Sequence, residues 1–457
     1  MATSLLDKNT IPDGLLPYKT KLTPRFYEVR NKVIDFVTEV VIPKSHIYGQ
    51  QRAELMKTVE HHTLCPQPPV LKELQAEAKS RGIMNLFLPE VAKMSVLEYS
   101  PIAEILGMYG IANLAMNCSA PDTGNMEVLE RFGSPEQKKQ WLEPLLNGEI
   151  RSAYAMTEPG VASSDATNIS CRMERDGDEY VVNGHKWWAS GAIRPECKLL
   201  VVLGKTSFTG PIHKQQTMML IPKHTPGVKI LRGLKVFGHT GDHAEIILDN
   251  VRVPASAVVL GEGRGFEIAQ GRLGPGRIHH CMRSLGVAEQ ALAAMVDRAH
   301  RRKAFGQLLA EKDGVKQMIA EARMEITMCQ QLCYLAACVA DEKGFKAAKS
   351  HIAMIKVAGI RAVIKIIDDA IQVHGAHGVS QDSKLEEMYR SYRYLRVGDG
   401  PDIVHLMTIA KEELAKGGGK AGRRVSGINP NVAKYGKFSH VEHGALYVEG
   451  SAATSKL

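Results

Sequence analysis

A single carboxylate lies between two glycines in the segment RYLRVGDGPDIVHL, residues 393–406. Glycines on both sides allow the backbone to approach another group closely, and Asp399 stands where that approach is tightest. A carboxylate at such a point can take or give a proton. The simpler interpretation is an Asx turn that closes a helix, which is the more frequent role of an Asp-Gly step.

A second group of polar residues lies in AYAMTEPGVASSDATN (153–168) and NGHKWWASGA (183–192). Amides and hydroxyls at the end of a strand can bind the polar edge of a flat heterocycle, and an indole on a neighbouring strand can cover its face. The pattern is therefore compatible with a planar cofactor. It is also compatible with a surface loop beside a tryptophan of the core.

Other candidate clusters indicate no metal. Cys329 and Cys333 are one helical turn apart, but their apolar neighbours favour two buried thiols. His279 and His280 are adjacent on a predicted helix and must point to different faces. GEGRGF (261–266) lacks the spacing of a dinucleotide-binding loop and reads as a turn between domains.

These residues need elements to position them, and the periodicity predicts three kinds of region. Apolar residues recur at helical spacing before residue 150, short β-branched runs with D-G, N-G and P-G turns follow, and helical spacing then returns in four long segments, about 266–303, 310–342, 346–374 and 382–416. We predict a mostly α fold with a β middle domain, whose strands form a compact antiparallel sheet. The predicted divisions are a leader (1–23), a helical domain (24–150), a β domain (151–262) that resembles a barrel, a four-helix bundle (263–416) and a mobile basic tail (417–457).

Composition limits the kind of partner. The 457 residues are 44% hydrophobic and 23% charged with a net charge of +9, which is typical of a globular protein that meets anions. No run of apolar residues is long enough to cross a membrane. We expect no nucleic-acid partner, because the basic residues form no stripe with interleaved aromatics.

The chain ends in Ser-Lys-Leu, the address that the peroxisomal import receptor reads. The first residues contain neither a secretory nor a transit signal. We therefore expect a peroxisomal location.

Five motifs together resemble the acyl-CoA dehydrogenase family in order and spacing. They are MTEPGVASSD, NGHKWWASG, RRKAFGQ, IQVHGAHGVS and GDGPD, and the resemblance covers about residues 25–416. NLFLPE and QGRLGPGRIHHCMR are most similar to a branch whose animal members carry a fused kinase-like domain. We expect no such domain in this protein.

The resemblance implies a bound FAD between the β domain and the bundle. Residues matched to FAD contacts within one chain are Tyr154, Met156, Thr157, Ser164, Trp188, Ala189, Ser190 and Pro401. Residues matched to contacts with the FAD of a neighbouring subunit are Arg302, Phe305, Gln372, Gly375 and Ala376. These shared sites imply a homodimer or a homotetramer.

The implied reaction is α,β-desaturation of an acyl-CoA, in which a base removes the α-proton and hydride passes to flavin N5. Asp399 occupies the position of the family's glutamate base, and Gly276 occupies the alternative base position, where it cannot act. Ser164, Arg277, Gly398 and Gly400 match the substrate side. Aspartate reaches about 1.5 Å less far than glutamate, so we expect the backbone between the glycines to compensate. Gly398, where the family has tyrosine, is expected to free volume near the thioester, and Ile403, where many members have glutamine, puts one FAD contact in doubt.

Two alternatives stay open from the sequence. An oxidase would pass the electrons to O2, whereas a dehydrogenase passes them to an electron-transferring flavoprotein. A flavoprotein of this fold could also be a binding module without activity. Neither the electron acceptor nor the length of the acyl chain follows from the motifs, although the branch favours long acyl chains. We expect the reaction to belong to fatty acid β-oxidation.

Overall fold

The computed structural model describes residues 4–58, 66–417, 438–442 and 445–448. The chain forms two compact units, residues 1–406 and 407–457. Every predicted site residue belongs to the first unit, whereas the predicted targeting signal lies outside the described residues. The second unit contains the end of α14 (Asp402–Gly417) and a hairpin of β10 (Phe438–Glu442) and β11 (Ala445–Val448).

The first part of the chain is helical, as its periodicity predicts. Two of its helices, α1 (Pro24–Asp35) and α8 (Pro135–Gln137), begin at polar caps: the Thr23 side chain accepts a hydrogen bond from the Phe26 amide, and Ser134 forms a capping box with Gln137 around Pro135. The α-helices are α1 (Pro24–Asp35), α2 (Ile42–Thr58), α3 (Val70–Ser80), α4 (Pro89–Ala92), α5 (Val96–Met108), α6 (Gly110–Ala115), α7 (Asp122–Phe132), α8 (Pro135–Gln137) and α9 (Glu143–Leu146).

The middle of the chain forms a seven-stranded sheet in the order β1-β4-β2-β3-β7-β6, with β5 paired to β4. Its strands are β1 (Arg151–Ala155), β2 (Arg172–Asp176), β3 (Glu179–Ser190), β4 (Cys197–Lys205), β5 (Gln216–Pro222), β6 (Val228–Val236) and β7 (His239–Pro254). We predict an antiparallel sheet, but β4 pairs in parallel with β1 and β2. Hairpin turns in the sequence reveal only antiparallel neighbours, so this prediction is wrong for these pairs.

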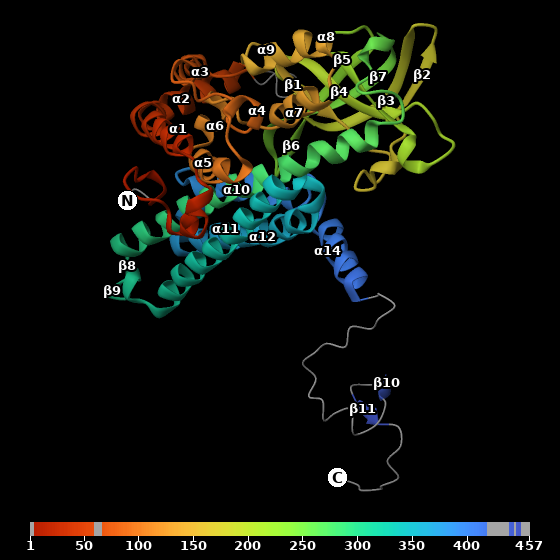
Figure 1. Ribbon diagram of the computed structural model, residues 1–457. Coiled ribbons are helices and arrows are strands. Elements are labelled where there is room, and N and C mark those ends of the chain that lie inside the picture. Colours follow the sequence, from red (N-terminus) through yellow and green to blue (C-terminus); the bar gives the residue numbers. More distant parts are fainter. Residues whose placement is uncertain (1–3, 59–65, 418–437, 443–444, 449–457) are drawn as a thin grey trace. The chain divides into compact units, whose positions relative to one another are not determined.

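The last part of the chain is again helical. Three long helices, α10 (Gly265–Arg301), α11 (Asp313–Ala347) and α12 (Lys349–His374), lie side by side (Figure 1). Of these, α10 contacts β4 and β5 of the sheet, and both α10 and α11 pack against α5. A small hairpin of β8 (Lys303–Ala304) and β9 (Gln307–Leu308) joins α10 to α11. The fourth predicted segment is not continuous. It consists of α13 (Lys384–Arg393), the 3-10 turn η10 (Tyr394–Arg396) and α14, with a break at residues 397–401.

Two glycines bring α5 and α10 into backbone contact. A Cβ atom on Gly107 would lie 1.9 Å from the Arg283 carbonyl oxygen, and one on Gly286 would lie 1.9 Å from that of Glu104. No other residue fits at either point, so the crossing fixes where residues 280–283 of α10 lie relative to the N-terminal helices.

Among the described residues, no helix is long and apolar enough to cross a membrane. The same residues contain no group of side chains with the composition of a metal site.

Candidate active site

The break at residues 397–401 places Asp399 in an unusual backbone conformation. Its φ is 55° and that of Gly400 is 103°, both in the left-handed region. A non-glycine residue there is strained, and such strain persists only where surrounding contacts hold it. The left-handed residues and Pro401 end the helical pattern here.

Two cationic side chains from other helices hold this loop. The Lys356 ammonium of α12 donates to the Leu395 carbonyl and, at 3.4 Å, to the Gly400 carbonyl. Arg277 Nε of α10 donates to the Asp399 carbonyl at 2.9 Å. Both cations bind backbone carbonyl oxygens, which fixes the loop. Neither Lys356 nor Arg277 forms an ion pair with the Asp399 carboxylate.

The Asp399 carboxylate lies in positive surroundings. Burial raises its pKa, but His280, Arg272, Arg277 and Lys356 together lower the pKa below its usual value. His280 Nε2 is 3.4 Å from Asp399 Oδ2. Burial, with the nearby Arg283, lowers the pKa of His280 to about 4, so the imidazole is neutral and the carboxylate is ionised at neutral pH.

The predicted glycine positions differ in their surroundings. A Cβ on Gly276 would meet nothing within 4 Å, so this side of α10 is open. A Cβ on Gly398 would lie 3.4 Å from the Tyr394 ring. Tyr394 therefore bounds the volume that we expected the missing tyrosine at 398 to free.

The loop after β1 is anchored from beneath by a buried ion pair. Lys186 of β3 donates to Glu158 Oε1 at 2.7 Å and to the Met156 carbonyl at 3.0 Å, and its side chain is fully buried. Glu158 also accepts from the amides of Ser170 and Cys171 at 2.8 and 3.0 Å. A carboxylate with this many donors locks the loop to β2 and β3.

Predicted cofactor residues lie along this anchored loop. The Thr157 carbonyl accepts from the Trp187 amide at 3.0 Å, which joins the loop to β3. Tyr154 is covered by the Arg272 guanidinium, 4.0 Å from its ring centre, and burial raises its pKa to about 12. Met156 is half-buried and Ser164 is exposed.

The end of β3 carries a local irregularity at the tryptophan pair. Its register with β7 shifts between Lys186 and Ala189, and Trp188 has a φ of 54° with 40% of its surface exposed. A bulge of this kind turns the indole out of the sheet. Ala189 is fully buried, and Ser190 Oγ lies 2.8 Å from His243 Nδ1.

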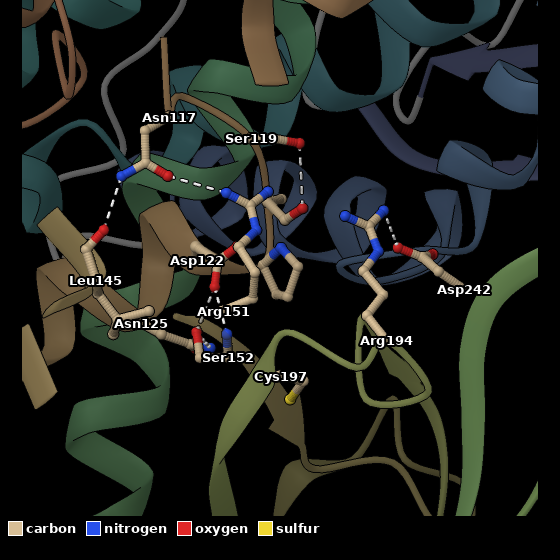
Figure 2. Close-up of polar contacts among 12 residues, drawn as sticks. Asn117, Ser119, Asp122, Asn125, Leu145, Arg151, Ser152, Arg194, Cys197 and Asp242 are labelled. Carbon is tan, nitrogen blue, oxygen red and sulfur yellow. Dashed lines mark hydrogen bonds and ion pairs between the residues drawn. The ribbon is translucent and has the colours of Figure 1, made fainter. Parts of the chain in front are cut away.

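Figure 2 shows the polar contacts that fix β1 and the turn after β3. Arg151 pairs with Asp122 at 3.0 Å and donates to Asn117 at 2.9 Å, while Asp122 accepts from the amide and hydroxyl of Ser152. Arg194 pairs with Asp242 at 2.5 Å. Both β1 and β3 therefore enter the site from rigid, buried supports.

The tertiary structure brings the two predicted groups together. The charge of Asp399 raises the pKa of Tyr154 in addition to burial, and it also acts on Tyr394. The ring of His243 contacts two other rings: its centroid lies 5.3 Å from that of Trp188 and 6.0 Å from that of Tyr394. These interactions show that Tyr154 of β1, the Trp188 bulge and the Asp399 loop lie close to one another.

The residues matched to a neighbouring subunit form a second group. Phe305 is 99% exposed with a φ of 54° at the tip of the β8–β9 hairpin. Arg298 Nη2 donates to the His374 carbonyl at 3.5 Å and so joins this hairpin region to the end of α12. The other members of the group are also exposed: Arg302, Gln372, Gly375 and Ala376.

Four residues that interact with Asp399 were not among the predicted site residues: Arg272, His280, Lys356 and Tyr394. The signal for His280 was present, because it follows Arg277 by three residues and such residues share a helix face. His279 faces away, with its ring 5.1 Å from that of Tyr99, so the prediction of different faces is confirmed. Lys356 had no such signal, since only the fold brings α12 to the loop.

Models of the N-terminal, middle and C-terminal domains of acyl-CoA dehydrogenases match residues 27–149, 153–251 and 263–414. Probable acyl-CoA dehydrogenase FadE2 of Mycobacterium tuberculosis is 50% identical over 86% of this chain and 97% of its own length. The chain belongs to the acyl-CoA dehydrogenase family. The predicted resemblance and the helical–β–helical fold class are thereby confirmed.

Other members of the family are longer than this chain. Acyl-CoA dehydrogenase family member 11 is 52% identical in Homo sapiens over 86% of this chain and 50% identical in Gallus gallus over 91% of it. The chain spans about half the length of these vertebrate relatives, 50% and 53% respectively.

Solved structures of the family share the fold. One assigned to an acyl-CoA dehydrogenase of Mycobacterium abscessus has a TM-score of 0.82 and 43% identity, covering 86% of this chain and 99% of that one. A glutaryl-coenzyme A dehydrogenase in complex with glutaryl-CoA has a TM-score of 0.74 at 23% identity, covering 88% of this chain and 98% of that one. The second likeness concerns the fold alone.

Proposed function

We propose that this protein catalyses the α,β-dehydrogenation of acyl-CoA thioesters to trans-2-enoyl-CoA in fatty acid β-oxidation, with Asp399 as the base. The observation that carries the proposal is an ionised carboxylate on a strained loop, held by Lys356 and Arg277 through backbone carbonyls only. Such a carboxylate is fixed in place yet free to meet a substrate proton.

The positive surroundings of Asp399 make it a weaker base in the resting enzyme but favour the state that follows proton transfer. They lower the pKa of the base in the resting enzyme. They also stabilise the negative charge that develops on the thioester enolate when the α-proton leaves. Because Arg272, Arg277 and Lys356 are fixed before the substrate arrives, this stabilisation needs no rearrangement during the reaction.

The β1 loop and the Trp188 bulge fit a planar cofactor with polar edges. Tyr154 Oη and Trp187 Nε1 are buried without a hydrogen-bond partner among the described residues, so polar atoms remain for a ligand at this edge. The half-exposed Trp188 indole, turned outward by its strained backbone, offers a flat apolar cover. Tyr154, Met156, Thr157, Ser164, Trp188, Ala189, Ser190 and Pro401 would hold FAD, which supplies a hydride acceptor when bound.

The substrate would lie between the Asp399 carboxylate and the cofactor, because its α-proton must reach the base while its β-hydride reaches the flavin. We assign Arg277, Ser164, Gly398 and Gly400 to the acyl-CoA side, where the open space beside Gly276 admits it. Because Arg277 donates to the Asp399 carbonyl, it would hold the base in a fixed position relative to the bound substrate.

The second group of residues supports a homo-oligomer. A phenylalanine that is 99% exposed contributes nothing to the stability of its own subunit, and its burial by a partner would be favourable. Phe305, with Arg302, Gln372, Gly375 and Ala376, would therefore complete the FAD site of a neighbouring copy.

The proposal is tested by the Asp399→Asn variant, with Asp382→Asn as a control that removes an exposed carboxylate. Asp399→Asn should retain FAD and bind acyl-CoA but leave the flavin absorbance unbleached under anaerobic conditions. The control should bleach at the wild-type rate. Rapid bleaching by Asp399→Asn would show that another group is the base.

The electron acceptor and the substrate range are addressed by two further measurements. Peroxide formed per acyl-CoA consumed separates an oxidase from an enzyme that uses an electron-transferring flavoprotein. Anaerobic bleaching across acyl-CoAs of different length and branching identifies the substrate. The peroxisomal location stays a prediction, since residues 449–457 lie outside the described part of the chain.

A further inference from the structure

A partly buried histidine, His280, contacts the Asp399 carboxylate. Three polar residues of α10, Arg277, His280 and Arg283, follow one another at three-residue spacing and share one side of the helix. His280 Nε2 lies 3.4 Å from Asp399 Oδ2, and Arg283 Nη2 lies 3.3 Å from His280 Nδ1. The three groups form a row that ends at the carboxylate.

The row determines which imidazole nitrogen carries the proton. A guanidinium has donors and no acceptor, so Arg283 must donate to His280 Nδ1, and Nδ1 must be unprotonated. The neutral imidazole then carries its proton on Nε2, which is the nitrogen that faces Asp399. His280 is thus a donor towards the carboxylate and has no free lone pair with which to act as the base itself.

We propose, on the basis of the function proposed above, that His280 is a positioning residue. Held in its Nε2–H form by Arg283, it donates to Oδ2 of Asp399 and leaves Oδ1 to take the α-proton. At 3.4 Å the contact is at the long end of the hydrogen-bond range, and such contacts shorten when substrate excludes water from a site.

This role answers a need that aspartate creates. A carboxylate one methylene shorter than glutamate depends on a precise approach, and an error of about 1 Å costs on the order of a hundredfold in rate. The donor row is itself rigid, because Arg283 also donates to the Cys118 carbonyl at 3.4 Å and its backbone packs on Gly107. The tight crossing of α5 and α10 therefore fixes the position of Arg283, which holds His280 beside Asp399.

Other groups also act on the carboxylate and must stay constant in a test. They are Arg272, Arg277 and Cys281 on α10, Lys356 on α12, Tyr154 on β1 and Tyr394 on η10. His405 of α14 faces the backbone of Asp399 and Gly400. The test therefore changes only His280 and compares variants with and without a donor at the position of Nε2.

The experiment measures proton transfer separately from hydride transfer. An acyl-CoA with sulfur in place of the β-carbon cannot give up a β-hydride, yet its α-protons can pass to Asp399 and be replaced by deuterons from D2O. Mass spectrometry of this probe gives the exchange rate. The rate of anaerobic flavin bleaching by acyl-CoA is also measured as a function of pH, and its decrease at low pH, the acid limb, reports protonation of the base. Four proteins are compared: wild type, His280→Leu, His280→Gln and the control His279→Gln.

We expect His280→Leu to exchange about 10- to 100-fold more slowly and to move the acid limb to higher pH, because the carboxylate loses a donor. His280→Gln, whose amide places a donor near the position of Nε2, should recover most of the rate and the original limb. The control, which changes the neighbouring histidine that faces Tyr99, should match the wild type in both.

Three results would overturn the proposal. The first is an exchange rate and an acid limb in His280→Leu that equal those of the wild type. The second is an equal loss of exchange rate in His280→Leu and His280→Gln with an unchanged acid limb. The third is an equal change in the His279→Gln control. If His280→Leu fails to retain FAD, His280→Asn replaces it, since its shorter amide can meet Arg283 but not Asp399. Bleaching by Asp399→Asn would instead refute the assignment of the base, independently of His280.

Discussion

Glu104 offers a quantitative test of the contact between the N-terminal helices and the bundle. It lies fully buried on α5, where its Oε2 accepts from Gln330 at 2.8 Å and its Oε1 contacts the Tyr334 hydroxyl at 3.0 Å, both on α11. No cation pairs with it among the described residues. Burial raises its pKa from 4.5 to about 8.

The sign of the pH dependence follows from this direction. Between pH 4.5 and about 8 the folded protein holds a proton on Glu104 that the unfolded chain has lost, so stability falls as pH rises through that window. At pH 7, about 2.5 pH units above the pKa of the unfolded carboxyl, this effect lowers the free energy of unfolding by about 3.4 kcal/mol. Below pH 4.5 this cost disappears.

The Glu104→Gln substitution removes the titration and keeps the shape. The amide oxygen accepts from Gln330, and the amide nitrogen donates to the Tyr334 oxygen, so both neighbours stay satisfied. We expect the unfolding free energy of the variant, relative to that of the wild type, to rise by about 2.7 kcal/mol from pH 5 to pH 7, which corresponds to about 3 °C in Tm for a chain of this length.

The assay is thermal unfolding of the FAD-loaded protein, with wild type and variant compared at pH 5, 6, 7 and 8. Only the difference between the two proteins is interpreted, since Glu127 is also buried with a pKa near 8 and titrates equally in both. A difference in Tm that does not change with pH would refute the assignment of a neutral Glu104.

Two further predictions concern the site. Lys356→Met removes the donor of the Leu395 and Gly400 carbonyls and a charge that lowers the pKa of Asp399. We expect a loss of about 1–3 kcal/mol in unfolding free energy and an acid limb of kcat/KM moved to higher pH; an unchanged limb would contradict the role of the ammonium. Phe305→Ser should weaken subunit association by about 1.5–3 kcal/mol per buried ring, measured by sedimentation velocity, while the Tm of the separated subunit stays constant. Unchanged association would place this ring outside any interface.

Much of the fold was predictable because its signals are local. Helical periodicity depends on residues within a few positions of one another, and so do the caps that Thr23 and Ser134 form in the structure. The parallel pairing of β1 with β4 was missed, because no hairpin turn connects the two strands.

The candidate site divides in the same way. Motif spacing was enough to select Asp399 and to dismiss Gly276, since both depend on residue identity at a matched position. The break in the last helical segment could have been inferred from Asp-Gly-Pro, although the regular apolar spacing on both sides suggested one helix.

By itself the sequence determined which residues can do chemistry: a carboxylate between glycines, a polar loop after a strand and an indole beside it. Tertiary structure alone decided their state. Asp399 is ionised because residues from α10 and α12 surround it, and His280 is a donor because Arg283 is held beside it. Ionisation and tautomer depend on burial and on charges within a few ångströms, and these are set by contacts between segments more than a hundred residues apart in places, which no local pattern encodes.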